Sequence, residues 1–270
     1  MTKHRLLNPV ALLPMLPMLL WAGAAAAQSR AAQTLNFEFG MDARDIDTSG
    51  STSNGTLGLK GTATIPLGRY FAIAASAGYS ESQVRTRDSL VDESGSNTGI
   101  ASCKFKGTQG GITLFARRPT LGKVGVSYGV NQLSSECGDS SRFVTSGDDS
   151  LDAKNYRVFA EYYLYDFTLA ASQTATELDH GDKLDSTSIT ASWYPLDSLR
   201  VSASAGNDLY ERDTYGIMLE HQPDFMGDGL GVYLGYERID QSPSTRTVTL
   251  GFVYYFGTRV DLKTRDRQYR

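Results

Sequence analysis

Hydrophobic and polar residues alternate one by one along most of the chain from residue 35 onward. In the first such segment, apolar residues occupy the odd positions from Leu35 to Met41, and polar or small residues occupy the even positions. A period of two is typical of a β-strand with one apolar face. The same alternation recurs in eleven further segments, which are 57–65, 71–79, 102–116, 124–130, 156–164, 167–171, 189–193, 199–205, 215–219, 230–236 and 248–256. The pattern predicts an all-β chain of about twelve strands, with ten or fourteen as alternatives.

The connections between these segments alternate between short and long. The short ones lie near 66–69, 117–122, 165–166, 195–198 and 223–229. The longer, polar ones lie near 46–55, 85–98, 131–152, 177–185, 207–213 and 240–244. Short turns on one rim and longer loops on the other are typical of an antiparallel up-and-down transmembrane β-barrel, whereas the crossovers of a soluble sandwich tend to break this order. We therefore predict one such barrel over residues 28–256.

The first 27 residues have the composition of a secretory signal peptide. Lys3 and Arg5 supply a positive start, an apolar run follows at 10–21, and alanines fill 24–27 as a small-residue cleavage site. The alternative is a membrane anchor, but the apolar run is shorter than the ~20 residues that a spanning helix needs. We expect residues 1–27 to be cleaved and the remaining chain to be exported.

Charge and hydropathy narrow the choice of partner. The formal net charge is −4 for the whole chain and becomes −6 when the leader, with its two basic residues, is removed. A mildly acidic chain is not expected to bind nucleic acid. The mean hydropathy of −0.29 is compatible with a membrane barrel, because only alternate residues of each strand face lipid.

Aromatic residues are concentrated beside the short turns. A ring of amphipathic aromatic side chains at one level is typical of a membrane–water interface, although aromatic residues also suit strands in general. We interpret this set as an interfacial girdle, formed by Tyr70, Phe71, Phe115, Tyr163, Tyr165, Phe167, Trp193, Tyr194, Phe225, Tyr254, Tyr255 and Phe256.

The leader, the alternating segments and the aromatic last strand at 248–256 resemble Gram-negative outer-membrane β-barrel proteins of the porin-like kind. The resemblance covers residues 33–256 and implies a place in the outer membrane, in contact with its lipid and lipopolysaccharide. In that group, the barrel-assembly machinery reads a last strand that ends in an aromatic residue, which implies that Phe256 is the assembly signal. This chain departs from the commonest pattern because it continues for 14 residues beyond Phe256. We interpret 257–270, with five basic and two acidic residues, as a frayed periplasmic tail.

The chain has two cysteines, Cys103 and Cys137. If the turn between the fourth and fifth strands centres near Thr120, the two cysteines lie opposite each other on the same face of one hairpin. At ~3.3 Å per residue they lie beyond the ~10 residues that cross the membrane. Because an exported chain meets an oxidising compartment, we predict a structural disulfide in an extracellular extension, with two unrelated thiols as the alternative.

Charged residues of both signs are predicted to face the lumen. Such charges can line a water-filled pore, or they can close the barrel as a salt-bridge network. Small inward residues on several strands leave room and favour a narrow pore. The candidate lumen-lining residues are Glu38, Asp42, Lys60, Lys123, Arg157, Glu161, Arg200, Glu220 and Glu237.

The sequence contains no motif from which we expect a catalytic site, a metal site or a cofactor. His180 lies in a polar loop that could hold a metal, but we interpret it as solvated. His221 is followed by Gln222 and Pro223, so it lacks the neighbouring serine that an outer-wall lipid hydrolase needs. We therefore expect the protein not to be an enzyme.

Two main functions and one remote one follow from these patterns. The first is a narrow, water-filled channel for small solutes. The second is a closed barrel with a structural, adhesion or surface-binding role. A lipid-modifying outer-membrane enzyme is the remote alternative.

Overall fold

The computed structural model describes residues 34–48, 54–91, 97–137, 150–179, 181–223, 229–240, 244–256 and 260–270. Within these ranges, the side chains of 84–91, 97–103 and 136–137 are not described. The predicted signal peptide, Phe225 and His180 lie outside the described residues.

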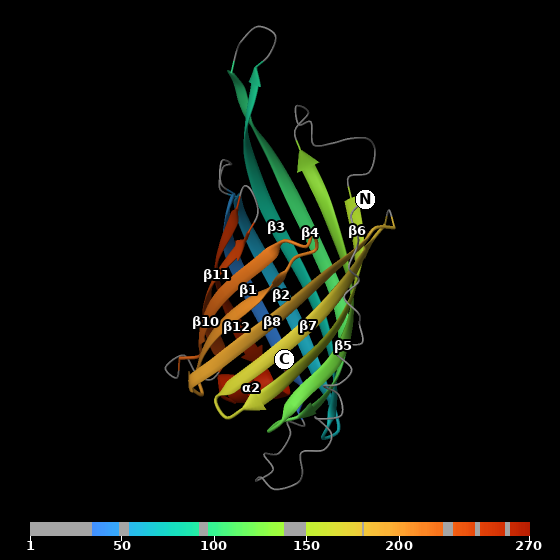
Figure 1. Cartoon of the computed structure of the whole chain (residues 1–270), viewed down its shortest axis with the longest axis vertical. Coiled ribbons are helices and arrows are strands. Elements are labelled where there is room, and N and C mark those ends of the chain that lie inside the picture. The colour runs from blue at the N-terminus through green and yellow to red at the C-terminus, as the bar shows by residue number, and fades with distance from the viewer. Residues whose placement is uncertain are drawn as a thin grey trace.

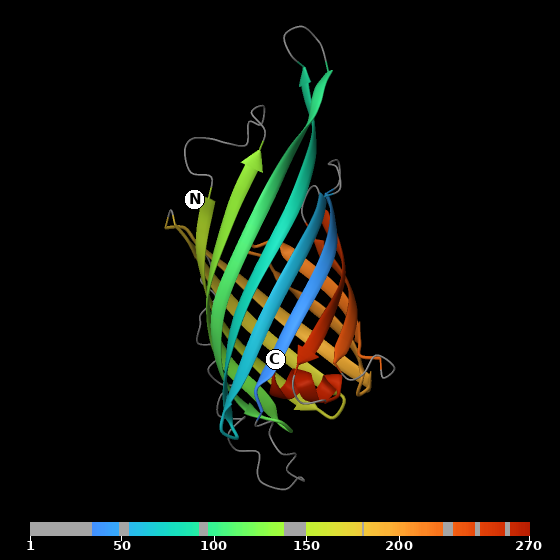
Figure 2. The ribbon, with the colours of Figure 1, turned by 180° about the vertical axis from the view of Figure 1, so that it is seen from behind.

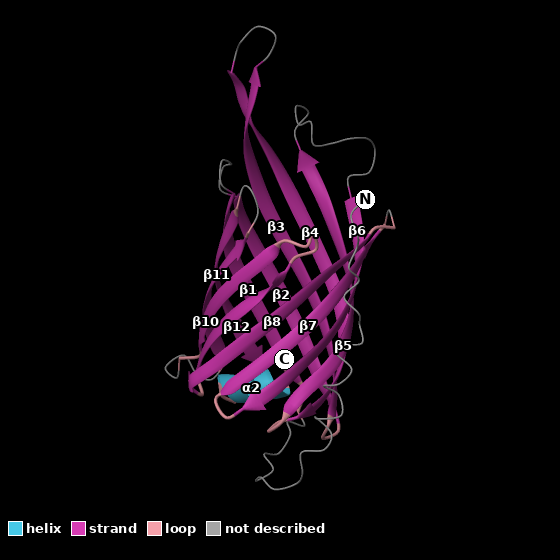
Figure 3. Cartoon of the chain, in the orientation of Figure 1, coloured by secondary structure: helices cyan, strands magenta, loops and turns pink. Residues whose placement is uncertain are grey.

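The described strands form one closed antiparallel barrel (Figure 1). Each strand pairs with its sequence neighbours, β1 closes the cylinder against β12, and strand makes up most of the chain described (Figure 3). The elements are β1 (Asn36–Thr48), β2 (Asn54–Leu67), β3 (Phe71–Val91), β4 (Asn97–Arg118), β5 (Gly122–Cys137), β6 (Ser150–Leu164), β7 (Phe167–Leu178), β8 (Lys183–Leu196), β9 (Leu199–Asn207), β10 (Asp213–His221), β11 (Leu230–Ile239), β12 (Thr245–Phe256) and α2 (Leu262–Gln268). The up-and-down barrel is confirmed, and its described part has twelve strands rather than ten or fourteen.

The alternation along each strand turns large apolar side chains to the outside. Ile217 of β10, for example, lies opposite Tyr236 of β11, and Ile189 and Ile217 are each 61% exposed. So much exposed apolar surface would promote aggregation in water, but it is stable where lipid covers it. Closure of the sheet also leaves no strand edge without backbone hydrogen bonds, which a barrel in hydrocarbon requires.

The hairpin of β3 and β4 projects beyond the rest of the barrel (Figure 1, Figure 2). Of the loops that we expected at 85–98 and 131–152, residues 85–91, 97–98, 131–137 and 150–152 are strand, and the rest lie outside the described residues. Outside the membrane neither face of a hairpin has to be apolar, so the period-two pattern fades while the backbone pairing continues. The register makes Cys103 and Cys137 direct partners across β4 and β5. Because their side chains are not described, the disulfide stays a prediction.

Residues 260–270 differ from the frayed tail that we expected. Asp261 caps α2, because its carboxylate accepts hydrogen bonds from the backbone N–H of Thr264 at 2.7 Å and from its hydroxyl at 2.9 Å. Leu262, Arg265 and Tyr269 are each at most 2% exposed. Among the described residues, no helix is long and apolar enough to cross a membrane.

Candidate functional site

The segment 260–270 lies inside the barrel at the rim of the short turns, and we call it the plug (Figure 2). The hydroxyl of Thr64 in β2 donates to the carbonyl oxygen of Tyr269 at 2.9 Å. From β8, the hydroxyl of Tyr194 donates to Asp266, also at 2.9 Å. Further partners lie on β1, β4, β5, β6, β9, β10 and β12, so the wall surrounds the plug.

Glu220 of β10 is the centre of a charge network that joins the wall to the plug. Its side chain is buried and accepts hydrogen bonds from Arg200 of β9 at 2.5 Å and from Tyr255 of β12 at 2.9 Å. Both terminal guanidinium nitrogens of Arg270, in the plug, bind its carboxylate at 3.1 Å. Charge-assisted bonds of this kind compensate the cost of burying the carboxylate.

Asp266 of the plug extends the same network. Its carboxylate accepts hydrogen bonds from Arg200 at 2.7 Å and from Arg270 at 2.8 Å. Arg200 therefore bridges Glu220 of the wall and Asp266 of the plug. Glu38 of β1 accepts a further bond from Arg270 at 3.2 Å. These contacts connect opposite sides of the seam between β1 and β12 through plug residues.

Two buried cations of the wall bind the backbone of the plug. Lys123 of β5 is 2% exposed, pairs with Glu161 of β6 at 3.0 Å and donates to the carbonyl oxygen of Asp266 at 3.2 Å. It also donates to the carbonyl oxygen of Arg270. Arg117 of β4 likewise donates to a carbonyl oxygen of the plug. The cations thus satisfy carbonyl groups that the last turn of a helix leaves free.

Three inward tyrosines form an aromatic collar around the plug. The guanidinium of Arg265 lies 3.4 Å from the ring centroid of Tyr255. That of Arg267 lies 4.8 Å from the ring of Tyr163 and 5.7 Å from the ring of Tyr194. Cation–π contacts of this kind are favourable where the pair is shielded from water.

The collar corrects the predicted aromatic girdle, because that set divides between the two faces of the wall. Adjacent residues of a strand point to opposite faces, so of two consecutive aromatic residues in one strand only one faces outward, whereas Tyr70 lies in the turn before Phe71. The buried, inward members are Phe115, Tyr163, Tyr194 and Tyr255. The exposed members, which remain a girdle, are Tyr70, Phe71, Tyr165, Phe167, Trp193, Tyr254 and Phe256.

Lys263 fastens the plug to two short turns at the rim. Its ammonium group lies 2.7 Å from the carboxylate of Asp166 and 3.2 Å from that of Asp197. Burial lowers the pKa of Lys263, but the bonds to the two carboxylates outweigh this effect and raise it. The same hydrogen bond lowers the pKa of Asp166. Because both carboxylates are exposed, this clamp contributes little to stability.

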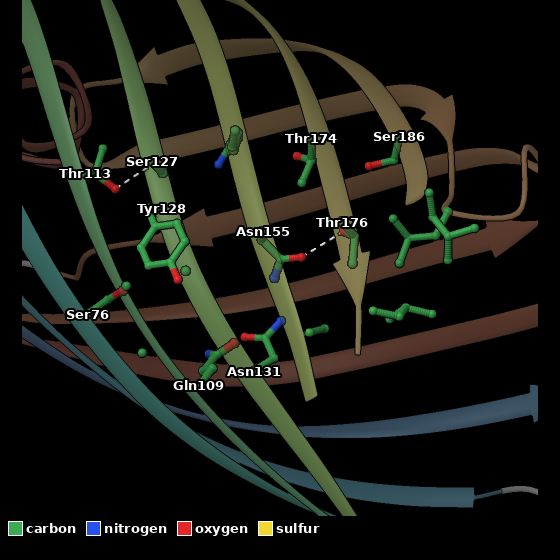
Figure 4. Close-up of a pocket in the computed structure, with 18 of the residues that line it drawn as sticks. Ser76, Gln109, Thr113, Ser127, Tyr128, Asn131, Asn155, Thr174, Thr176 and Ser186 are labelled. Carbon is green, nitrogen blue, oxygen red and sulfur yellow. Dashed lines mark hydrogen bonds between the residues drawn. The ribbon is translucent and has the colours of Figure 1, made fainter. Parts of the chain in front are cut away.

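The rest of the lumen holds a cavity of about 660 Å³ (Figure 4). The hydroxyls of Thr113 and Ser127 lie 2.9 Å apart, and Thr176 donates to Asn155 at 2.7 Å. Small polar side chains of this kind leave a hydrated space rather than a packed core. The hydroxyl and amide residues of the lining are Ser76, Gln109, Thr113, Ser127, Asn131, Asn155, Thr174, Thr176 and Ser186.

The structure divides the nine predicted lumen residues. Lys60 and Arg157 line the cavity, and neither forms an ion pair with any described residue. Asp42 pairs with Arg44 at 2.6 Å, and Glu237 is exposed on the same strand face as Tyr233. The remaining five form the wall side of the plug network, and they are Glu38, Lys123, Glu161, Arg200 and Glu220.

Sequence reasoning missed the plug residues Arg265, Asp266 and Arg270. One signal was available: Tyr163 and Tyr255 share the inward parity of the polar residues in their strands. A large ring turned into the lumen at a rim needs something to pack against.

His221 lies on the outward face at the short-turn rim. Its ring nitrogen Nδ1 lies 3.2 Å from the backbone carbonyl oxygen of Ser198. Within the described part of the chain, the hydrogen-bond partner of this ring is thus a carbonyl group and not a serine hydroxyl.

No protein family matches the chain, and no curated protein matches it in sequence. Solved structures do match it. The β domain of the Bordetella autotransporter BrkA superposes with a TM-score of 0.54 at 11% identity, over 82% of this chain and 99% of that chain. The KdgM porin in complex with disordered oligogalacturonate gives 0.51 at 10% identity, over 81% and 99%. A deltaS2S3 mutant of TodX, a monoaromatic hydrocarbon channel, gives 0.54 at 12% identity, over 85% and 91%. The chain therefore has the fold of outer-membrane porins and autotransporter barrels.

Proposed function

We propose that the protein is an outer-membrane channel for small solutes, and that the plug closes it at the short-turn rim in the resting state. The observation that carries this proposal is the division of the lumen. One part is a polar cavity with uncompensated cations, and the other is filled by an eleven-residue segment that is not part of the barrel wall. A closure made by a segment outside the strand ladder can leave while that ladder stays intact. A porin and a hydrocarbon channel with the same fold support the transport role.

Planar-bilayer recordings test the proposal. The full mature chain should be electrically silent. A chain without residues 260–270 should give discrete open-channel steps, because the plug no longer fills the lumen at the short-turn rim. Lys263→Gln is the matched control: it removes only the exposed clamp, and the barrel should stay silent.

Three outcomes contradict the channel or its closure. The shortened chain could be electrically silent although its unboiled and boiled forms still migrate differently on a detergent gel. It would then be a folded barrel without a pore. Equal conductance with and without the plug means that the plug does not close the barrel. A Lys263→Gln variant as conductive as the shortened chain means that the buried network does not hold the plug.

The buried ion network favours a second candidate, a permanently closed barrel with a surface-binding role. Networks of this density resist opening, because each separated ion would be left without a partner in a poorly solvated interior. The cavity would then be a binding pocket that is closed by the plug and open toward the rim of the long loops. If the chain without residues 260–270 shows no conductance in planar bilayers, this result supports the closed barrel over the channel.

The proposed location and partners follow from the outward face. Apolar side chains around the wall suit membrane lipid, with lipopolysaccharide at the rim of the long loops and a cleaved signal peptide, residues 1–27, for export. Phe256, at the end of β12, is 53% exposed and pairs with Phe37 at the seam. We therefore keep Phe256 as the proposed assembly signal for the barrel-assembly machinery.

Cys103 and Cys137 should form a disulfide across β4 and β5. Directly opposed positions on antiparallel strands bring Cβ atoms to ~4.5–5.5 Å, from which small adjustments reach disulfide geometry. Mass spectrometry of non-reduced digests should find the two peptides linked. Cys103→Ser should leave the heat-dependent gel shift unchanged, because the bridge lies outside the membrane-crossing ladder. Free thiols in protein prepared without reductant contradict the prediction.

A further inference from the structure

We propose that the lumen cavity binds an anionic amphiphile, an apolar chain that ends in a carboxylate or a similar anionic group, and that this is the class of solute the barrel carries. The anionic group points toward the plug, and the chain points toward the rim of the long loops. As a statement about transport the inference rests on the proposed channel function, whereas binding can be measured on the closed barrel.

The end of the cavity near the plug carries uncompensated positive charge. Lys60 and Arg157 line it without an ion pair to any described residue. Among the charged groups around Lys60, the carboxylate of Glu38 acts most strongly, and the cations Arg270, Arg157 and Arg44 act against it. That carboxylate is already bound to Arg270 at 3.2 Å. A bound anion would supply the missing partner.

Amide side chains add hydrogen-bond donors to the lining of the same cavity. Gln109 of β4 and Asn131 of β5 are direct register partners and lie side by side in the cavity (Figure 4). Amide NH₂ groups can donate to the oxygens of a carboxylate. The polar part of the cavity therefore suits an anionic group better than a bare apolar one.

The other end of the cavity is apolar. Leu151 is 40% exposed although it lies on the inward face of β6, and Leu178 and Leu184 follow on β7 and β8. The β9–β10 turn adds Leu209 and Tyr210 to the same lining. Leucine surface inside a hydrated lumen is unfavourable unless an apolar ligand covers it.

The β9–β10 turn that carries part of this surface is held in place by its own hydrogen bonds. The carboxylate of Asp208 accepts from the backbone N–H of Tyr210 at 2.9 Å and of Arg212 at 3.0 Å. The guanidinium of Arg212 also lies 5.0 Å from the ring of Tyr210. The apolar end is thus built before any ligand arrives.

The order of residues along β6 sets the length of the ligand. Arg157, Asn155, Ala153 and Leu151 follow one another on the inward face, from cation to amide to apolar residues. Arg157 and Leu151 are ~20 Å apart at ~3.3 Å per residue. A short carboxylate cannot contact both ends, and a neutral chain leaves the cations without a partner. A carboxylate on a chain of medium length satisfies both.

Calorimetry on the full mature chain in detergent-free phosphatidylcholine discs tests the proposal. Dodecanoate should bind saturably, one per protein, after subtraction of its heat of partition into empty discs. Hexanoate lacks six methylene groups and should bind more than roughly a hundredfold more weakly. Dodecanol lacks the charge and should bind roughly tenfold more weakly.

Two variants and a matched control locate the site. Lys60→Gln combined with Arg157→Gln should weaken dodecanoate roughly tenfold and leave dodecanol unchanged, because only the charged partner is lost. Leu184→Asn should weaken both ligands. Lys154→Gln, on the outward face of the same strand as Arg157, should change neither.

Several results overturn the proposal. They are the absence of saturable dodecanoate binding, equal affinity for dodecanoate and dodecanol, and full affinity in the double variant. A shortened chain that stays silent while the full chain binds dodecanoate rejects the channel and leaves the binding site standing. If the shortened chain conducts but the full chain binds no dodecanoate, the channel function stands and an anionic amphiphile is not its solute.

Discussion

Replacing Glu220 by alanine should release the plug and make the barrel leak. The change removes the acceptor that Arg200, Arg270 and Tyr255 share, and leaves two guanidinium groups short of a partner in a dry interior. Breaking a buried ion pair costs about 3–5 kcal/mol, and we expect the lower end, because Asp266 still binds both arginines. Step conductance in planar bilayers should appear, and the temperature at which the compact gel band is lost should fall.

Glu237→Ala is the control for this substitution. Glu237 lies on the inward face of β11 but is exposed and forms no ion pair within the described residues, so the plug should stay seated and the bilayer silent. Glu220→Gln separates charge from shape, since it keeps the size of the side chain. If Glu220→Ala remains silent with unchanged heat stability, the network around Glu220 does not hold the barrel closed.

Replacing Arg157 by glutamate in the chain without residues 260–270 should shift the ion preference of the open pore toward cations. The cavity loses one uncompensated cation and gains an anion, and each unit charge changes the local energy of a passing ion by about 1 kcal/mol at 4 Å in water. The permeability ratio of cation to anion, from reversal potentials in a salt gradient, should rise by about tenfold at low salt. High salt should reduce the effect by screening.

Lys154→Glu makes the same change in charge three residues away but on the outward face of β6. It should leave the permeability ratio nearly unchanged. An unaltered ratio in Arg157→Glu, or an equal change in the two variants, means that ions do not pass Arg157.

The barrel could be predicted from the sequence because its signal is local. Alternation along β6, for instance, places Arg157 on the lumen face and Tyr156 on the lipid face without any knowledge of neighbouring strands. The plug could not be predicted in the same way. A helix of seven residues is too short to be stable alone, so its stability comes from contacts such as Thr64 with Tyr269, which are 205 residues apart.

The split within the candidate site has the same cause. The sequence correctly indicates that Arg200 and Glu220 share the lumen face with Arg157. Only their distances to Asp266 and Arg270 show that these two residues bind the plug, whereas Arg157 lines the cavity. Those partners lie in a segment with no alternation at all. The sequence therefore favoured a narrow pore from its small inward residues, but strand register alone could not distinguish the open barrel from the closed one.

The plug binds residues of both the first strand, β1, and the last, β12, and this has a consequence for biogenesis. Its docking site does not exist until the first strand has met the last, because Glu38 and Tyr255 flank the seam and both contact Arg270. A half-inserted sheet offers only part of that site and cannot seat the plug. Under the proposed function, residues 260–270 can therefore close only a completed barrel, and a half-inserted one stays open.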